Sequence, residues 1–346
     1  MKKLTTTLGR VTLKNPLIAG AAEHMIDATG VRRALKTGVG AVVVKSTNES
    51  KLGRDQLQRA EYMILDEYWR QIPWGPGAPA TAFIACRSGL TPQAFDAWLD
   101  QTAQLDREAR VDDSFAVASL ILADLEPAVH MAKQVEQAGV RILELNIGTP
   151  YASQAEGVVS TELDPKRVST IVAAIRNAVS IPLWVKITGQ SERVPDLAAA
   201  AFNAGGEAVV MAGRSLGLIP DIETLQPMLG TTLGVGGYWN LPLTCQWLAL
   251  SRAQVGQEKP LIATNGAQNG LDMVRMMLAG ASAVQMASAV MLRGVNVLST
   301  ALAEFEAYLA RKQLTAPQLI GLAADRRQLF SAMPLRRDNW RNYVIS

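Results

Sequence analysis

The sequence predicts an α/β fold whose strands close into a (β/α)8 TIM barrel. One observation is length, because 346 residues with 49% hydrophobic content are enough for one large core. Another is order, since apolar β-rich runs alternate with amphipathic helical stretches, as in a parallel sheet covered by helices. The third is number: roughly eight such units over roughly 290 residues favour a closed barrel over the alternative, a doubly wound open sheet.

The segments expected to form the barrel strands are short apolar runs that end in polar or small residues. They are residues 16–21, 41–47, 115–121, 141–147, 182–188, 207–213, 260–266 and 283–289. A polar and aromatic insertion follows the second strand at about 48–80, and 81–85 is expected to be an extra strand. We therefore expect a single domain, 1–346, with this insertion and a C-terminal helical extension at about 312–346.

The helices are predicted from their periodicity and from residues typical of helix ends. Thr91 is a candidate N-cap for a helix at 91–109. Gly139 is expected to end a helix at 126–137. Asp164, followed by a proline, is expected to cap the next helix.

The composition excludes several kinds of protein. Cys86 and Cys245 have neither disulfide nor metal spacing, and they are too few to hold an iron–sulfur cluster. No apolar run is long enough to span a bilayer, and no secretory h-region follows the first lysines, so we expect a cytoplasmic protein without membrane contact. The net charge of +3 is spread out. The basic tail at 334–346 is better explained by solvent or subunit contact than by nucleic-acid binding.

Polar side chains follow the predicted strands at the ends where barrel enzymes place their active sites. They are Lys45, Ser46, Thr47, Asn146, Lys186, Arg214, Asn265 and Ser288. Strand ends also become polar simply because they meet water. Two lysines that each follow a buried strand favour function, and they indicate an anionic partner.

Small residues gather in loops near the end of the chain. TNGAQNG at 264–270 and MASAVMLRG at 286–294 each lead from a strand into a helix, and GVGGYWNLP at 234–242 precedes another helix. Such loops let a phosphate approach backbone N–H groups closely, and barrels often bind phosphate after strands seven and eight. No GxxxxGK[ST] motif occurs, so the site differs from a P-loop.

These motifs, taken in order, resemble the dihydroorotate dehydrogenase family, the FMN-binding barrels that also include the pyrimidine-reducing domain of dihydropyrimidine dehydrogenase. LKNPLIAGAA, AVVVKST, LELNIGTP, WVKIT, GVGG and ATNGAQNGLDMVRMMLAGASAVQMASA match successive parts of the family pattern over nearly the whole chain. The resemblance implies an FMN-dependent oxidoreductase acting on CH–CH groups, with hydride exchange at flavin N5.

The resemblance also assigns roles to residues. Lys186 is expected to face the N1–O2 edge of the flavin, Lys45 to lie near ring and substrate, and Asn146 to contact both. The remaining cofactor-binding residues implied are Gly20, Ala21, Ser46, Gly213, Gly236, Gly237, Asn265, Gly266, Ala287 and Ser288. Glu144, two residues before Asn146, points to the same side of its strand and is expected to anchor the barrel interior.

The sequence departs from the family in the substrate region. Thr149 stands where the family has its proton-transferring Cys or Ser, and Tyr151 replaces a pyrimidine-binding Asn, so either is a candidate proton donor or acceptor. Met211 and Arg214 lie in a segment that is Asn-rich in the family, and Arg214 is a candidate carboxylate ligand. With these losses, orotate lacks hydrogen-bond partners, and we expect another substrate.

Aromatic side chains are frequent in the loops expected around this site. They either enlarge the pocket or pack a lid or subunit interface; they are Tyr62, Tyr68, Trp69, Trp74, Tyr151, Tyr238 and Trp239. His24, beside Glu23 after the first strand, is a candidate acid, base or substrate contact. His130 lies within a predicted helix and is expected to be structural, and no metal site is expected.

Four functions remain in competition. The leading one is an FMN oxidoreductase with a small-molecule substrate other than orotate. The others are a genuine dihydroorotate dehydrogenase, a catalytically silent flavin-binding subunit, and a phosphate-binding aldolase or isomerase that uses one of the lysines. The electron donor or acceptor is unknown from the sequence, and we expect a homodimer because barrels of this family commonly pair.

Overall fold

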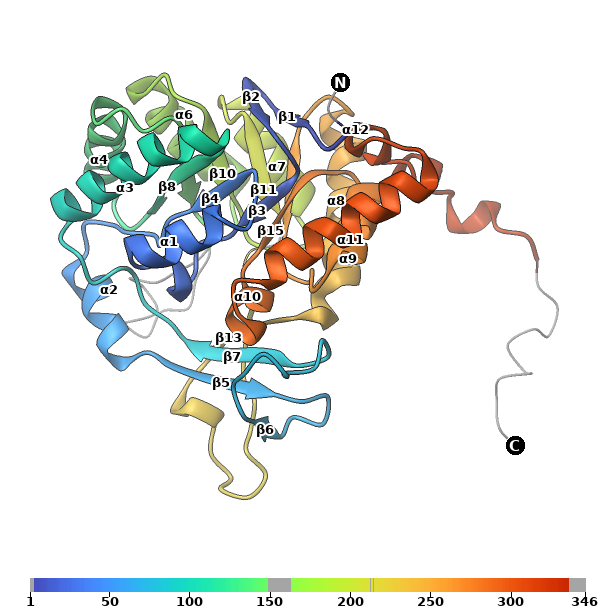
Figure 1. Cartoon of the computed structure of the whole chain (residues 1–346), viewed down its shortest axis with the longest axis horizontal. Coiled ribbons are helices and arrows are strands. Elements are labelled where there is room, and N and C mark those ends of the chain that lie inside the picture. Colours follow the sequence, from blue (N-terminus) through green and yellow to red (C-terminus); the bar gives the residue numbers. More distant parts are fainter. Residues whose placement is uncertain (1–2, 149–162, 212, 214, 336–346) are drawn as a thin grey trace.

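The computed structural model describes residues 3–148, 163–211, 213 and 215–335. Its centre is a closed barrel of parallel strands in the order β10-β11-β14-β15-β3-β4-β8-β9 (Figure 1). The strands are β3 (Leu17–Ala19), β4 (Ala41–Val43), β8 (Phe115–Ile121), β9 (Leu143–Asn146), β10 (Leu183–Lys186), β11 (Ala208–Met211), β14 (Leu261–Thr264) and β15 (Ala281–Met286). Each predicted barrel strand is present, so the predicted fold class is confirmed.

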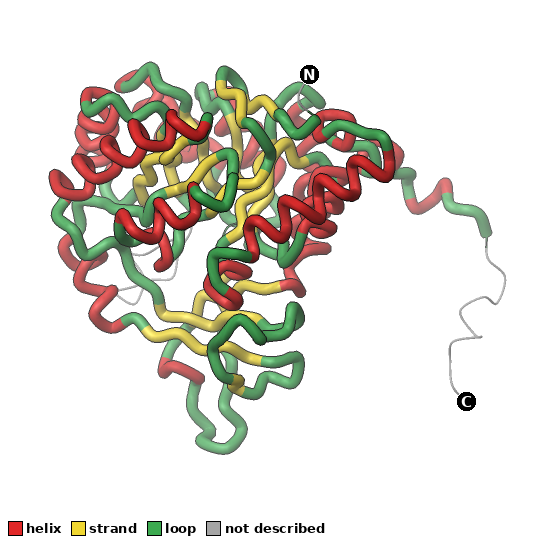
Figure 2. The backbone as a smooth tube through the Cα atoms, viewed as in Figure 1, coloured by secondary structure: helices red, strands yellow, loops and turns green. Residues whose placement is uncertain are grey.

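Helices surround the barrel on its outer side (Figure 2). They are α1 (Ala28–Leu35), α2 (Lys51–Asp55), α3 (Phe95–Ala109), α4 (Leu125–Gln137), α6 (Pro165–Ala178), α7 (Val194–Asn203), α8 (Leu241–Val255), α9 (Gly270–Leu278), α10 (Ser288–Arg293), α11 (Val297–Lys312) and α12 (Ala316–Leu319). Asp164 caps α6 as predicted, because its side chain accepts a hydrogen bond from the Lys166 backbone N–H. Thr91 was the wrong cap for α3, which begins after Ala94 without a side-chain cap.

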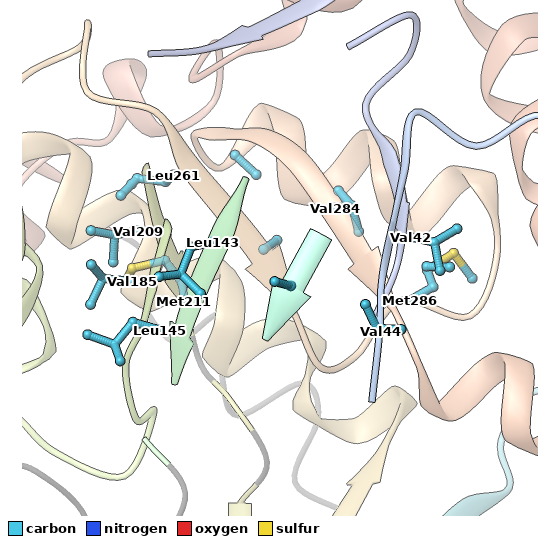
Figure 3. Packing of buried hydrophobic residues seen from close by; sticks show 14 of the residues in the cluster. Val42, Val44, Leu143, Leu145, Val185, Val209, Met211, Leu261, Val284 and Met286 are labelled. Atoms are coloured by element: carbon cyan, nitrogen blue, oxygen red, sulfur yellow. The ribbon is translucent and has the colours of Figure 1, made fainter. Parts of the chain in front are cut away.

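The barrel strands alternate between two apolar cores. Val42 and Val44 face outward toward the helices, whereas Ala41 and Val43 face inward. Figure 3 shows the outer set, which packs between strands and helices. Because side chains alternate along a strand, Glu144 lies on the inner side, opposite to its outward neighbours. The polar residues at the strand ends are therefore directed into the barrel.

A short hairpin closes the amino-terminal end of the barrel. It consists of β1 (Thr6–Leu8) and β2 (Val11–Leu13), which pair antiparallel. Leu8, Val11 and Leu13 join the inner core, and the Thr6 hydroxyl donates a hydrogen bond to the Ser282 carbonyl at the start of β15. The opposite end of the barrel is left for the site.

A separate antiparallel sheet lies beyond the carboxyl-terminal ends of the barrel strands (Figure 1). Its order is β12 (Ser215–Gly217), β13 (Leu233–Gly237), β7 (Phe83–Arg87), β5 (Glu61–Leu65) and β6 (Gln71–Ile72). The insertion therefore supplies β5 and β6, and the single extra strand expected at 81–85 is the middle of a sheet. GVGG was predicted to be a loop, but it forms β13, which pairs with β7.

The remaining described elements are short 3-10 helices: η1 (Glu23–Met25), η2 (Gln56–Arg59), η3 (Arg110–Asp112), η4 (Met228–Gly230), η5 (Tyr238–Asn240), η6 (Ala324–Arg326) and η7 (Phe330–Ala332). The segment after α12 first packs against α8 and α9, where Arg252 donates to the Asp325 carboxylate, and the part after η6 extends away from the barrel (Figure 1). The division into one domain with an insertion and an extension stays a prediction. No helix in the described part of the chain is long and apolar enough to cross a membrane.

Candidate active site

A cavity lies between the carboxyl-terminal ends of the barrel strands and the small sheet. The space between its atoms amounts to about 1020 Å³ when the open solvent at the mouth is included. The predicted cofactor-binding residues that line it are Gly20, Ala21, Lys45, Ser46, Asn146, Lys186, Gly213, Gly236, Asn265, Gly266, Ala287 and Ser288. Residues from eight separate parts of the sequence thus meet where the barrel architecture predicts a site.

The floor of the cavity is a closed hydrogen-bonded network. The Lys186 Nζ donates to Glu144 Oε1 and to Gln285 Oε1, both at 3.0 Å, and Gln285 Nε2 donates to Glu144 Oε2 at 2.6 Å. The Glu144 side chain is fully buried, and Lys186 lines the cavity. Since a buried charge needs a partner, Glu144 stabilises the ammonium in one orientation. The result is a positioned cation at the base of the site.

Asn146 lies beside this cation because of the strand register. In the parallel pair of β9 and β10, Asn146 is opposite Lys186. Its Oδ1 accepts a hydrogen bond of 3.0 Å from the Gly148 backbone N–H, which fixes the side chain at the end of β9. The strand end therefore presents a positioned amide and an ammonium next to each other.

One wall of the cavity carries a second lysine–carboxylate pair. The Lys45 Nζ donates to Glu23 Oε1 at 2.6 Å, and both residues line the cavity. Their side chains are 6% and 18% exposed, respectively. The Lys45 backbone is anchored on both sides, since its N–H donates to the Met25 carbonyl and its carbonyl accepts from Trp98 Nε1. Helix α3 thus fixes the position of the lysine.

The Glu23 carboxylate is held in its ionised form. Burial acts to raise its pKa, but the charge of Lys45 and hydrogen bonds from Lys45 and Tyr62 outweigh burial and lower the pKa below its ordinary value. At neutral pH this wall therefore carries one negative and one positive charge side by side. Ser46, next in the chain, shares a hydrogen bond of 2.8 Å with the Ser119 hydroxyl.

His24 lies next to Glu23 in the chain, but it is not among the described residues that line the cavity. Both of its ring nitrogens are buried and have no hydrogen-bond partner within the described part of the chain. Burial lowers its pKa to about 4, with the nearby charge of Lys45 acting in the same direction. The imidazole is therefore neutral at physiological pH, and the predicted substrate contact stays a prediction.

Small residues form the other end of the cavity. Gly266 has a φ of +120°, and a Cβ there would lie 2.7 Å from the Leu241 backbone. Asn265 adopts a left-handed φ of +69°, and its backbone carbonyl accepts a hydrogen bond of 2.7 Å from the Thr244 hydroxyl. Its side-chain oxygen lies over Gly236, 3.4 Å from where a Cβ would be. Gly266 therefore packs closely against Leu241, and Gly236, Asn265 and Gly266 all line this end of the cavity.

Gly237 differs from the other predicted cofactor residues, because it is not among the described residues that line the cavity. A Cβ at this position would lie 2.4 Å from the Phe83 Cβ on the paired strand β7. The structure gives this glycine a packing role between β13 and β7.

Several predicted residues do not enter the described site. Thr149, Tyr151 and Arg214 lie outside the described residues. Met211 is buried in the outer core. The expectation of an aromatic pocket is not met by the described lining, where no aromatic residue occurs; Tyr68, Trp69 and Trp74 are exposed on the insertion instead.

The sequence interpretation missed some residues of the site. Gln285 was given no role from the sequence, although it lies in a segment that matches the family pattern. Alternation along β15 directs its side chain into the barrel, where it accepts a hydrogen bond from Lys186. Ile84, Cys86 and Ser88 line the cavity from the side of the small sheet. No local signal predicts them, because they reach the site only through the pairing of β7 with β13. No cluster of metal-ligating side chains occurs within the described residues.

Comparison with known proteins agrees with this architecture. A family model described as dihydroorotate dehydrogenase matches residues 81–309, more than half of the chain. The chain is 29% identical over 325 residues to a dihydroorotate dehydrogenase B (NAD(+)) catalytic subunit from Methanocella arvoryzae, covering 93% of this chain and 98% of the relative. Proteins of the same name from Methanocaldococcus jannaschii and Pyrococcus furiosus are 25% and 27% identical, over 92% and 90% of this chain and 98% and 96% of theirs.

The matched region includes the floor of the cavity and its glycine-rich end. The resemblance expected from the sequence motifs is therefore confirmed. Proteins of this family generally bind FMN and oxidise or reduce CH–CH bonds. The chain belongs to the dihydroorotate dehydrogenase family and is an oxidoreductase acting on CH–CH groups.

Proposed function

We propose that this chain is an FMN-dependent oxidoreductase that adds or removes hydrogens across a carbon–carbon bond next to a carbonyl group, on a substrate other than orotate. When bound, FMN supplies hydride exchange at N5 of its ring. The observation that carries the proposal is the Lys186 ammonium, held at the cavity floor by Glu144 and Gln285. A cation fixed in this way stabilises negative charge on a reduced ring without having to reorganise.

The small residues of the cavity fit the rest of such a cofactor. Gly20 and Ala287 both line the cavity, and such small residues let a ligand approach the backbone closely. We assign the ring to Gly20, Ala21, Lys45, Ser46, Asn146, Lys186 and Gly213. We assign the ribityl chain and phosphate to Gly236, Asn265, Gly266, Ala287 and Ser288.

The substrate part of the proposal rests on the amide side chains. Among the described lining residues these are Asn146, Asn265 and Gln285. Gln285 is engaged in the floor network, and Asn265 lies over Gly236 at the opposite, glycine-rich end. This supports a substrate with fewer polar groups than orotate, since a polar ligand buried without partners binds poorly.

The proton that accompanies the hydride is assigned to the loop after β9. Thr149 or Tyr151 would carry it, because hydroxyl groups there follow directly on Asn146 in the chain. A threonine needs a water or base to accept its proton, whereas a tyrosine is itself a competent acid. Arg214 and His24 are proposed substrate contacts.

A genuine dihydroorotate dehydrogenase is the second candidate, and the names of the relatives favour it. Those relatives are named NAD(+)-linked catalytic subunits, which supports a protein as the electron partner of this chain. We propose the homodimer as its assembly, and the expected cytoplasmic location stays a prediction.

The test begins with the visible spectrum of the freshly purified protein and the identity of any flavin released on heating. We expect the bands of oxidised flavin and release of FMN. The protein is then reduced with dithionite without oxygen and mixed with a panel of α,β-unsaturated carbonyl compounds that includes orotate. Reoxidation by a panel member, with orotate much slower, is the expected result. A colourless protein that fails to bind added FMN contradicts the cofactor assignment, and fast reoxidation by orotate contradicts the substrate assignment.

A further inference from the structure

The wall pair of Glu23 and Lys45 has a consequence for what the cavity accepts. A single ammonium on the wall of a cavity attracts a carboxylate on the ligand. Here the ammonium already contacts a carboxylate at 2.6 Å, and that carboxylate lines the same cavity. The wall is thus a dipole rather than a cation.

The charges of the described cavity lining are balanced. Its charged members are Glu23, Lys45 and Lys186. Lys186 is paired with Glu144, and Lys45 is paired with Glu23. The neighbouring His24 is neutral, because burial lowers its pKa to about 4. Within the described lining, neither ammonium lacks a carboxylate.

A ligand carboxylate that approached Lys45 would come close to the Glu23 carboxylate. The two anions would share one ammonium, and burial would strengthen their repulsion. Specificity often depends on such a repulsive element placed against the wrong ligand. An uncharged ligand meets no such penalty, and it can place a carbonyl oxygen against Lys45 and an N–H or O–H donor against Glu23.

We propose that Glu23 is a specificity-determining residue that neutralises Lys45, so that this wall of the cavity takes the carbonyl group of an uncharged ligand and rejects a carboxylate. The ligand class is an unsaturated carbonyl compound, or its reduced form, with a hydrogen-bond donor close to its carbonyl. This inference rests on the proposed function and deepens it, since it names the residue that excludes orotate, which carries a carboxylate. The carboxylate of Glu23 stays ionised although burial acts to raise its pKa, because the charge of Lys45 and the hydrogen bonds from Lys45 and Tyr62 lower that pKa below its ordinary value.

The test compares anions with their uncharged amides in the Glu23→Gln variant. Calorimetric titration of the holoprotein is made with orotate and its primary amide, and with acetate and acetamide, which are small enough for any part of the cavity. We expect Glu23→Gln to bind at least one of the two anions about 10-fold or more tightly than the native protein does, because Lys45 loses its partner. Affinity for the amides is expected to change by less than about 3-fold.

The matched control is Glu61→Gln, which removes a carboxylate from the small sheet, where Glu61 pairs with Arg87 outside the cavity. Its anion affinities are expected to equal those of the native protein. A Glu23→Gln variant that gains affinity for neither anion overturns the inference. Tighter binding of orotate than of its amide by the native protein overturns it as well, and needs no variant.

These outcomes are separate from the test of the proposed function. A protein that contains FMN and is reoxidised by uncharged carbonyl compounds, but whose Glu23→Gln variant gains no anion affinity, keeps the function and loses the role of Glu23. A protein without flavin loses the proposed function, whatever its anion affinity.

Discussion

The cavity contains two lysine–glutamate pairs that differ in origin. At the floor, Lys186 and Glu144 come from the paired strands β10 and β9, and Glu144 is fully buried. At the wall, Lys45 follows β4, and Glu23 lies in η1 with 18% of its side chain exposed. The pleat of two strands determines the floor pair, whereas the conformation of one turn determines the wall pair. The proposed reaction chemistry therefore rests on the barrel strands, and the proposed selectivity rests on the adjoining turn.

Breaking the floor pair is expected to have the largest effect on stability. Glu144→Leu leaves the Lys186 ammonium buried without its carboxylate, which costs about 3–5 kcal/mol of unfolding free energy. Urea unfolding monitored by circular dichroism measures the change. Glu61→Gln on the exposed pair with Arg87 is the control and is expected to cost less than about 1 kcal/mol. A Glu144→Leu protein as stable as the control would mean that the floor pair is not structural.

Removing the floor charge while keeping a hydrogen-bond donor is expected to slow the reaction. In the proposed function Lys186 stabilises negative charge on the reduced ring, so Lys186→Gln is expected to lower the rate of flavin reduction or reoxidation about 100- to 1000-fold per bound flavin. Stopped-flow absorbance gives this rate, and the flavin midpoint potential is expected to become more negative. A rate within about 3-fold of native, with the potential unchanged, would remove Lys186 from the mechanism.

Lowering the pH is expected to weaken the wall region through His24. Its folded-state pKa of about 4 is below the ordinary value of 6.5, so the unfolded chain binds the proton more readily between these values. Stability is therefore fully present above pH 6.5 and is lost as pH falls toward 4, by roughly 3 kcal/mol. Unfolding free energies of native protein and His24→Leu across this window measure the effect.

The other histidine provides the control for this pH dependence. His130 is exposed on α4. The unfolding free energy of His130→Gln is therefore expected to change with pH as that of the native protein does. The unfolding free energy of His24→Leu is expected to change less with pH than that of the native protein. Equal slopes in the native and His24→Leu proteins would show that the buried imidazole is not the source.

Replacing both members of the wall pair is expected to have the smallest effect on stability. Glu23→Met with Lys45→Met leaves no uncompensated charge, so the unfolding free energy changes by less than about 1 kcal/mol. Urea unfolding measures the free energies of unfolding of this double variant and of Glu144→Leu, and their difference compares the wall pair with the floor pair. A double variant as unstable as Glu144→Leu would make the two pairs equivalent and contradict the comparison.

The barrel and the floor were largely predictable from the sequence. The eight strand segments were recognised because each is a short apolar run before a polar end, and alternation directs Lys186, Asn146 and Glu144 inward. The order of the chain around a closed barrel then brings these ends together.

The small sheet and the wall were not predictable in the same way. β13 pairs with β7 across Gly236↔Ile84, residues far apart in the chain, and its glycines had indicated a loop. The contact between Glu23 and Lys45 depends on how η1 turns after β3, which no periodicity encodes. Residue types alone therefore suggested two lysines facing an anion, whereas the structure shows each lysine paired with a carboxylate.

The most direct test of the central claim is the anaerobic reoxidation of the native, dithionite-reduced holoprotein by orotate and by orotate's primary amide, followed at the flavin absorbance. These two compounds have the same ring and differ in charge. The account predicts that the amide reoxidises the flavin at least about 10-fold faster than orotate at equal concentration. Faster reoxidation by orotate would contradict it and identify the protein as a dihydroorotate dehydrogenase in the strict sense.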